Sequence, residues 1–406
     1  MAARTSGEAG LSVWLTCPAP DGPYEPFNQL FTRPEWVLTA GQQKTCTLTL
    51  HGEQIRLKAH WRAVAEYLRT LTGHWLAGYL SYSLAEQQIL GPDPRPADAL
   101  PGLVIGGFRS PSDQVPEPDA RASAFRLSAP FQPLWERPDY VAAFERVQHY
   151  ILAGDCYQIN LTQALQAPYQ GDPLTLFRAL VGRFRAPFSG YVQFNGQAVL
   201  SFSPERFLRI EKDQVETRPI KGTRPRRADP LADHQEARAL LASEKDRAEN
   251  LMIVDLLRND LGRFCVPGSI RVPALFALER YSNVHHLVST VTGTLREAVT
   301  PLAVLEGCSP GGSITGAPKI RAMQIIRELE PLPRGVYCGS LFYLSPEGVL
   351  DSSIAIRTLT TDGRHIRVWG GGGVVADSAA DPEFEESMTK IRHLIEAIEA
   401  FGTGAA

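Results

Sequence analysis

The fold class is indicated by residues 191–202, which read Tyr191-Val192-Gln193-Phe194-Asn195-Gly196-Gln197-Ala198-Val199-Leu200-Ser201-Phe202. Two runs rich in apolar and aromatic residues flank an Asn-Gly pair, which tolerates the positive φ of a tight turn. The stretch therefore predicts a β-hairpin of two antiparallel strands. Residues 206–210 and 215–220 predict a second hairpin directly after the first.

Helical patterns lie on both sides of these hairpins. We expect a helix near residues 61–71, and another over residues 141–151, where apolar side chains recur at helical spacing. One long helix is predicted from about residue 233 to 258, another begins near residue 318, and a last one near residue 382. Tight-turned strands mixed with separate helices, without regular β–α–β units, predict an α+β fold with antiparallel sheets.

The chain has 406 residues, enough for one large domain or for two to three ordinary ones. Residues 109–138 are rich in proline and lack apolar periodicity, so they predict a connection. We therefore expect an N-terminal part at 1–108, the connection at 109–138 and a second region at 139–401. The residues alone leave open whether 109–138 divides two domains or lies inside one.

Composition and charge exclude several classes of protein. Hydrophobic residues make up 44% of the chain and charged residues 21%, which is typical of a folded globular protein. The formal net charge of −3 argues against a protein that coats nucleic acid. No run approaches the ~20 apolar residues that span a bilayer, and no secretory signal is visible. We therefore expect no nucleic acid and no membrane among its partners.

The cysteines point to a reducing compartment. The six cysteines are far apart in the sequence, and no Cys-x-x-Cys pair predicts zinc or a redox dithiol. Isolated thiols are typical of proteins in the cytosol, so we expect a cytoplasmic location. The chain also lacks Gly-x-Ser-x-Gly and Gly-x-Cys-x-Gly, so it shows no hydrolase or glutaminase nucleophile of those kinds.

A lysine in a basic turn is the first candidate for chemistry. Residues 217–226 place Lys221 between two prolines and a glycine, among three arginines. Neighbouring cations disfavour a further positive charge, so they could lower the pKa of Lys221 and leave a nucleophilic amine. Most lysines are ordinary surface charges, and the residues alone favour a solvated basic turn.

Acidic residues on two predicted helices form the second candidate. Asp246 and Glu249 are three residues apart and share a helix face. Glu383, Glu386 and Lys390 lie within about 60° on a helical wheel. Two carboxylates from different helices, completed by water and substrate oxygens, are a common way to hold Mg²⁺. The alternative is ordinary ion pairing on exposed helices, which such patterns indicate more often.

Two glycine-rich segments could approach a ligand closely. Residues 310–319 predict a loop that leads into a helix, where hydroxyls and backbone amides can bind an anion. Ala317-Pro318 stands where a P-loop needs Lys-Ser/Thr, so nucleotide binding of that type is rejected. Residues 370–373 are four consecutive glycines after a β-branched run, which indicates close approach to a ligand or a neighbouring strand.

Eight segments, in order and at matching spacing, resemble the chorismate-utilising enzymes. The segments are residues 154–161, 203–206, 219–223, 246–255, 284–287, 310–319, 351–358 and 371–390. They cover about two thirds of the chain. The resemblance implies two packed, mainly antiparallel β-sheets with helices outside. It also implies that residues 1–108 contribute to the same sandwich.

The resemblance further implies an activity. The segment Pro219-Ile220-Lys221-Gly222-Thr223 resembles the motif of one subfamily of these enzymes. That subfamily combines chorismate with ammonia into 4-amino-4-deoxychorismate, for p-aminobenzoate and folate synthesis. Large subunits of anthranilate synthase typically carry Ala at the position of Lys221. Members that add water usually carry a Lys base where Gln158 stands. Two alternatives stay open, namely an anthranilate synthase large subunit and a non-catalytic chorismate-binding protein.

Site residues follow from the resemblance. It implies that Lys221 is the nucleophile, that Glu205 is a general acid with a raised pKa, and that Mg²⁺ is the cofactor. The metal would be held by Glu249 and Glu386, with Asp246 and Glu383 as second-tier ligands of metal or water. The substrate-binding positions would be Ser313, Thr315, Tyr337, Arg357, Gly371, Gly373, Lys390 and His286. The expected partners are chorismate, ammonia and a separate glutamine amidotransferase subunit.

Overall fold

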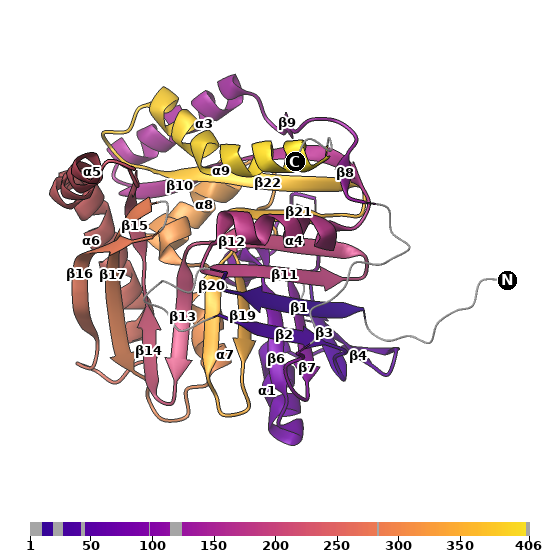
Figure 1. The fold of residues 1–406 in the computed structure, drawn as a ribbon. Helices are drawn as coiled ribbons and strands as arrows, with labels where there is room; N and C mark the ends of the chain where they lie inside the picture. Colours follow the sequence, from indigo (N-terminus) through magenta and orange to yellow (C-terminus); the bar gives the residue numbers. More distant parts are fainter. Residues whose placement is uncertain are drawn as a thin grey trace.

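Two antiparallel β-sheets share the centre of the molecule, and helices lie outside them (Figure 1). The structure is a computed structural model, and it describes residues 10–18, 27–41, 45–96, 98–113, 124–281 and 284–402. The predicted α+β class with two antiparallel sheets is confirmed. Among the described residues, no helix is both long and apolar enough to cross a bilayer.

The first sheet has the strand order β18-β10-β22-β21-β12-β11-β1-β2, with β8 and β9 paired to β10. Its strands are β1 (Leu11–Thr16), β2 (Gln29–Thr32), β8 (Arg126–Leu127), β9 (Gln132–Pro133), β10 (Gln158–Gln170), β11 (Phe188–Phe194), β12 (Gln197–Ser203), β18 (Gly316–Ala317), β21 (Thr358–Thr361) and β22 (His365–Val374).

The second sheet has the order β15-β17-β14-β13-β20-β19-β6-β7-β3-β4-β5, with β16 paired to β17. Its strands are β3 (Trp36–Ala40), β4 (Cys46–Leu50), β5 (Glu53–Leu57), β6 (Trp75–Leu80), β7 (Leu103–Phe108), β13 (Arg206–Glu211), β14 (Gln214–Thr217), β15 (Ile220–Pro225), β16 (Arg271–Arg280), β17 (Val284–Thr294), β19 (Ser340–Leu344) and β20 (Leu350–Ile354).

Strands from the first 108 residues enter both sheets. β1 pairs with β11 in the first sheet, and β6 pairs with β19 in the second. Strands from the first 108 residues thus pair with later strands in both sheets. Of the proline-rich segment 109–138, residues 114–123 lie outside the described part of the chain, and α3 begins at Arg137.

Both predicted hairpins form, with one difference. β11 and β12 turn at Asn195 (φ 49°) and Gly196 (φ 78°), as the Asn-Gly pair predicts. β13 and β14 form the second hairpin, but the predicted strand over 215–220 ends at Thr217. β15 then begins at Ile220 and pairs with β17 instead. Pro219 has no N–H to donate to a ladder, which explains the interruption.

The helices are α1 (Trp61–Thr72), α2 (Tyr82–Leu90), α3 (Arg137–Leu152), α4 (Pro173–Phe184), α5 (Pro230–Ala242), α6 (Glu244–Gly262), α7 (Pro301–Cys308), α8 (Lys319–Leu329) and α9 (Ala380–Gly402), with a 3₁₀ turn η1 (Gly312–Ile314). The prediction of one helix over 233–258 was wrong. The chain leaves helical geometry at Ser243 (ψ 107°), whose hydroxyl accepts a hydrogen bond from the Asp246 N–H. A serine in this position caps the following helix and allows α6 a direction of its own.

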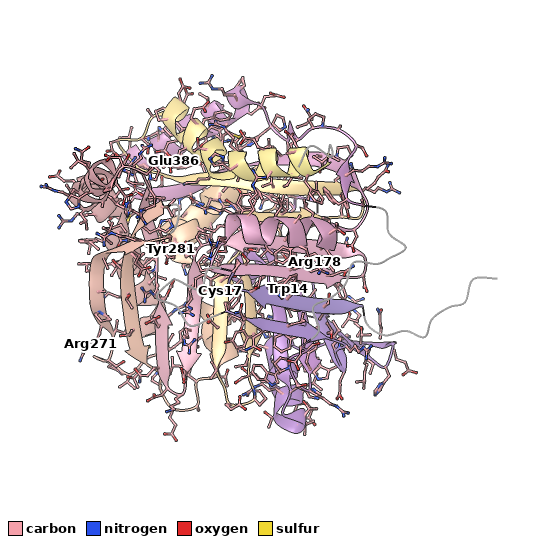
Figure 2. The ribbon with its side chains drawn as sticks, viewed as in Figure 1. Trp14, Cys17, Arg178, Arg271, Tyr281 and Glu386 are labelled. Carbon is pink, nitrogen blue, oxygen red and sulfur yellow. The ribbon has the colours of Figure 1, made fainter. Side chains whose placement is uncertain are left out.

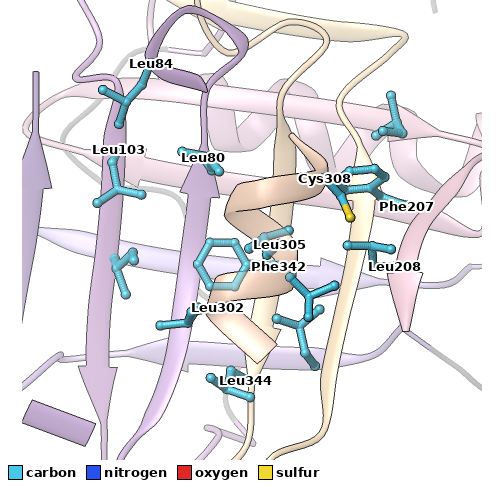
Figure 3. Packing of buried hydrophobic residues seen from close by; sticks show 14 of the residues in the cluster. Leu80, Leu84, Leu103, Phe207, Leu208, Leu302, Leu305, Cys308, Phe342 and Leu344 are labelled. Atoms are coloured by element: carbon cyan, nitrogen blue, oxygen red, sulfur yellow. The ribbon is translucent and has the colours of Figure 1, made fainter. Parts of the chain in front are cut away.

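The second sheet packs against α7 on one face (Figure 3). Leu302, Leu305 and Cys308 of the helix lie against the strands that carry Leu80 and Phe342, and all five side chains are buried. On its other face, this sheet meets the first sheet through buried residues such as Val13, Val104, Val192 and Leu341. The helices α4 and α9 cover the outer face of the first sheet, with Leu180 and Ile398 in one buried cluster. The result is a layered molecule in which α9 packs on β22 and α6 packs on β15 and β17.

Candidate active site

The predicted site residues come from many separate elements and gather at one end of the two sheets. Lys221 lies on β15, Glu205 just before β13, and His286 on β17. α6 and α9 lie beside each other here, since Lys245 Nζ is 3.8 Å from Glu383 Oε1. Figure 2 shows Glu386 on α9, toward the side of the molecule where α5 and α6 lie.

Lys221 lies at the centre of this group. Its amine forms no hydrogen bond or ion pair within the described part of the chain. Burial lowers the pKa of Lys221, the Glu249 carboxylate opposes that shift, and the nearby Lys390 cation reinforces it. A lowered pKa leaves more of the amine in its neutral, nucleophilic form.

The predicted cause of this shift was wrong, although its direction was right. Arg218 pairs with Glu279, Arg224 with Asp246 at 3.1 Å, and Arg226 with Asp233 at 2.9 Å. Each arginine of the basic turn is therefore neutralised by an acid from another element. Burial and Lys390, which is distant in sequence, act on Lys221 instead.

Gly222 fixes the backbone beside the lysine. Its φ is +82°, and a Cβ at this position would lie 2.8 Å from Leu240 Cδ1 and 2.9 Å from Asp246 Cγ. Only glycine fits both the left-handed conformation and this close approach of α5 and α6. The backbone next to Lys221 is thereby packed closely against the two helices.

Glu205 is a buried carboxyl group whose pKa is raised to about 7. Burial raises it, while the Ser313 hydrogen bond and the Lys221 charge act in the opposite direction. Ser313 Oγ donates to Glu205 Oε1 at 2.8 Å. The rise in the pKa that the sequence predicts is confirmed, and Glu205 can carry a proton near neutral pH.

Arg357 and His286 also line the site, Arg357 as a cation and His286 as a neutral side chain. Arg357 has a φ of +50°, an uncommon conformation for a residue with a side chain. Its guanidinium has no hydrogen bond or ion pair with any described residue, and burial lowers its pKa. Burial also lowers the pKa of His286 to about 3, and the Arg357 charge adds to this. His286 is therefore uncharged at neutral pH, and Arg357 is available to bind an anion.

The glycines of β22 let other groups approach the strand. Lys390 Nζ lies 2.9 Å from the Gly371 carbonyl oxygen. A Cβ on Gly372 would lie 3.1 Å from Glu383 Oε2 and 3.8 Å from Glu386 Oε1. A Cβ on Gly373 would lie 2.5 Å from the Gln158 amide nitrogen. The four-glycine run therefore makes room for α9 carboxylates and for β10, which is one of the two predicted possibilities.

The carboxylates suit a hard cation such as Mg²⁺ in their donor chemistry. Burial raises the pKa of Glu249. Burial also acts upward on Glu386, but the Lys390 charge, with Nζ 2.8 Å away, outweighs it and lowers the pKa. Glu383 accepts a hydrogen bond from Ser378 Oγ at 2.6 Å. Within the residues that the structure describes, no group of three or more His, Cys, Asp or Glu is already arranged around one point. The protein would thus supply few ligands, with water and substrate completing the shell.

Two predicted substrate-binding residues are turned to other partners. The Thr315 hydroxyl is fully buried and donates to the Gly311 carbonyl oxygen at 2.9 Å. Tyr337 is buried, and its ring stacks on Trp369 with centroids 5.7 Å apart and planes at 9°. Asp246, predicted as a metal residue, is paired with Arg224. The roles predicted for these three residues stay predictions.

Sequence reasoning missed Thr223 and Lys245. Thr223 Oγ1 lies 2.9 Å from His286 Nδ1 and so orients that ring. Lys245 faces the Glu383 carboxylate. Strand alternation could not have found Thr223, because the pairing of β15 with β17 shifts register between Ile220 and Thr223. Helical spacing could have found Lys245, which is four residues before Glu249.

Comparison with known proteins gives one consistent result. A family model described as chorismate binding enzyme matches residues 105–396. The chain is 40% identical to aminodeoxychorismate synthase component 1 of Salmonella typhimurium, over 93% of this chain and 90% of that protein. It is 49% identical to the Escherichia coli protein of the same name, over 68% of this chain and 61% of that protein. The crystal structure of anthranilate synthase component I from Streptococcus pneumoniae superposes with a TM-score of 0.77 at 25% identity, over 97% and 94% of the two chains.

Proposed function

The chain belongs to the chorismate binding enzyme family, and we propose that it catalyses the reaction for which its Salmonella and Escherichia coli relatives are named. In that reaction, chorismate and ammonia form 4-amino-4-deoxychorismate and water. The observation that carries the proposal is the position of Lys221. An amine with a lowered pKa lies within the electrostatic reach of the buried acid Glu205.

Substrate binding would use two cations of the site, Arg357 and Lys390. Chorismate is a dianion, and Arg357 offers a guanidinium that no described carboxylate neutralises. A guanidinium can hold a carboxylate with two parallel hydrogen bonds, which fixes its orientation. Lys390 adds a second positive charge close to the Gly371 carbonyl group. These contacts would set the ring with its carbon 2 toward Lys221.

The first chemical step would be addition of the Lys221 amine to ring carbon 2. The new carbon–nitrogen bond forms while the ring double bonds shift and the bond from carbon 4 to its hydroxyl breaks. Hydroxide is a poor leaving group, so the proton of Glu205 passes to it and water leaves. Glu205 is suited to this because its pKa of about 7 keeps part of it protonated.

The second step would release the lysine. Ammonia adds at carbon 4, the double bonds shift back, and the bond between carbon 2 and Lys221 breaks. The extra proton on the new amino group can return to Glu205, which was left as a carboxylate. The lysine leaves as a neutral amine, which its lowered pKa favours. The enzyme is thereby restored, and the enolpyruvyl ether of chorismate stays intact.

We propose Mg²⁺ as the cofactor, held by Glu249 and Glu386, with Glu383 as a supporting group. When bound, such an ion neutralises a substrate carboxylate and fixes its place. The support is the donor chemistry, since the Glu383 and Glu386 carboxylates of α9 lie near Gly372, and the charge of Glu386 acts on Glu249 of α6. Lys390, which pairs with Glu386 in this structure, would then be free to turn toward the substrate.

We propose a glutamine amidotransferase as the source of ammonia. The relatives are named component 1, which fits an enzyme that works with a second component. We also propose a place in p-aminobenzoate and folate synthesis, and a cytoplasmic location. The six free cysteines, five of which are buried, suit a reducing compartment.

Anthranilate synthesis is the second candidate, because the Streptococcus pneumoniae neighbour carries that name. The two reactions differ in one product, since anthranilate formation releases pyruvate. Incubation of the protein with chorismate, Mg²⁺ and excess ammonium close to neutral pH, where part of Glu205 is protonated, tests the proposal. We expect a product that keeps its enolpyruvyl group, identified by mass, and no pyruvate. Anthranilate with free pyruvate would establish the second candidate instead, and unchanged chorismate would indicate a binding protein without this activity.

A further inference from the structure

Arg334 is among the largest fully buried side chains of the molecule, and no catalytic role accounts for it. It is 1% exposed and lies between α8 and β19 in the sequence. Its Nε and Nη2 donate to the two oxygens of Glu330 at 2.9 and 2.7 Å. The guanidinium also lies over the ring of Tyr82, 4.8 Å from its centroid. Buried ion pairs contribute little net stability compared with apolar residues, so stability alone does not explain this pair.

The remaining hydrogen bonds of Arg334 go to the backbone around the active site. Nη1 donates to the Ile314 carbonyl oxygen at 2.7 Å, and Nη2 donates to the Asn160 carbonyl oxygen at 2.5 Å. The Asn160 N–H in turn donates to the Thr315 carbonyl oxygen at 2.8 Å. One residue of β10 is thus joined to the loop at residues 311–316 twice, once directly and once through Arg334.

Glu330 fixes the other side of the guanidinium. Its Oε1 accepts hydrogen bonds from the Thr162 N–H at 3.0 Å and from the Thr162 hydroxyl at 2.8 Å. The carboxylate is therefore anchored to β10 as well. A planar fork with several donors can satisfy two carbonyl oxygens and a carboxylate at once, whereas a lysine ammonium at the end of a flexible stem cannot.

The loop at residues 311–316, which Arg334 contacts, contains Ser313, and Ser313 donates a hydrogen bond to the general acid Glu205. Ser313 is the direct neighbour of Ile314, and its hydroxyl donates to Glu205 Oε1 at 2.8 Å. Lys221 is the charged group whose field reaches Glu205. The adjacent Arg206 is turned away, since it pairs with Asp351 at 2.9 Å.

We propose that Arg334 is a positioning residue for proton transfer, because it holds the loop at 311–316 in the place where Ser313 reaches Glu205. The inference rests on the proposed function, in which Glu205 donates the proton. Displacement of the loop would remove a hydrogen bond that favours the carboxylate form of Glu205. The acid would then lose its proton at a higher pH, and its orientation toward the leaving hydroxyl would suffer.

The test compares the pH dependence of kcat for R334K, S313A and the double variant R334K/S313A, with chorismate, Mg²⁺ and ammonium. We expect kcat of R334K to fall about 10- to 100-fold, as a small misplacement of a catalytic group does. We expect the alkaline limb of the kcat profile to move to higher pH in all three variants. The shift of the double variant should equal that of S313A, because both changes remove one contact.

R327K is the matched control. Arg327 on α8 is also largely buried, pairs with Glu86 at 3.1 Å, and donates to the Gly91 carbonyl oxygen at 3.0 Å. It has no contact with the loop among the interactions of the described residues. R327K should lower the unfolding temperature, as R334K does, but leave the alkaline limb of the profile where it is in the wild type.

A second variant, E330Q, keeps the test possible if R334K does not fold. If R334K is not obtained folded, E330Q removes the charge that orients the guanidinium and keeps the side-chain shape, and we expect its alkaline limb to move in the same direction. If the alkaline limb of the kcat profile of R334K stays at the wild-type pH, the inference is overturned. The same holds for E330Q where it replaces R334K. Equal shifts in R327K would do the same. Failure of the wild type to aminate chorismate would instead overturn the proposed function.

Discussion

Glu205 is the residue whose chemistry depends most on its surroundings. An exposed glutamate is ionised at neutral pH, but burial raises the pKa of Glu205 to about 7. A general acid must be protonated to act, so its contribution is present below that pKa and is lost as the pH rises through about 7. Activity with a saturating supply of free ammonia should fall along this limb.

We predict that E205Q lowers kcat by about 10²- to 10⁴-fold, the usual contribution of a positioned proton donor. The glutamine keeps the size of the side chain and can still accept the Ser313 hydrogen bond. The measurement is kcat between pH 6 and pH 9, together with the unfolding temperature of both proteins. A variant with wild-type kcat and an unchanged alkaline limb would show that another group donates the proton.

The proposed metal ligand Glu386 gives a second test at the same scale. We predict that E386Q raises the Mg²⁺ concentration for half-maximal activity by at least about 10-fold, since even residues behind the ligands typically contribute that much. Removal of divalent ions by a chelator should abolish the activity, and added Mg²⁺ should restore it. E385Q is the control, because Glu385 is on the same helix but pairs with Arg392, whereas Glu386 lies near Gly372. Equal Mg²⁺ requirements for E386Q and E385Q would rule out Glu386 as a ligand.

Some of these residue-level features could be predicted from the sequence, and others could not. The direction of the Lys221 pKa shift was predicted, but its causes are burial and the charge of Lys390, and both arise only on folding. Arg334 could not be recognised, because nothing local in the sequence shows that its partners lie on β10 and in the loop at 311–316. Motif matches locate residues that touch a substrate, whereas residues that hold such groups from behind need the fold.

At the scale of elements, the junction between α5 and α6 is the clearest difference from expectation. Periodicity continues through residues 233–258, so a single helix was the natural prediction. The break arises because Ser243 can cap a new helix with its own side chain. The hairpin at Asn195 and Gly196 was predictable for the opposite reason, since its turn chemistry is entirely local.

We predict that S243A lowers the free energy of unfolding by about 1 kcal/mol, the typical effect of losing an N-cap. The hydroxyl accepts the Asp246 N–H, and no alanine atom can replace it. S243N should keep most of the stability, because asparagine is also a good cap. Denaturant unfolding of the three proteins measures the difference. An S243A protein as stable as the wild type would mean that the cap is not what separates α5 from α6.

For the whole molecule, the two sheets depend on strands from both ends of the described chain. β6 and β7 lie inside the second sheet, between β19 and β3. Leu76, Leu80, Leu103 and Ile105 on these strands are fully buried. Each such side chain contributes roughly 1.5–3 kcal/mol, while the net stability of a protein is only about 5–15 kcal/mol. The molecule should therefore lose its fold when this part is removed.

We predict that a chain without residues 1–108 does not unfold cooperatively. Its remaining strands β11 and β19 would each lose a hydrogen-bonding neighbour. Thermal unfolding followed by circular dichroism compares the truncated and full chains. A sharp transition in the truncated chain, together with chorismate binding, would show instead that residues 109–406 form an independent domain.

The central claim is that the protein aminates chorismate through a covalent bond to Lys221. The most direct measurement compares the wild type with K221A in chorismate, Mg²⁺ and ammonium, with products resolved by mass and chorismate binding measured on both proteins. The account predicts that K221A folds and binds chorismate but forms no aminodeoxychorismate above background. Formation of aminodeoxychorismate by K221A at the wild-type rate would contradict it.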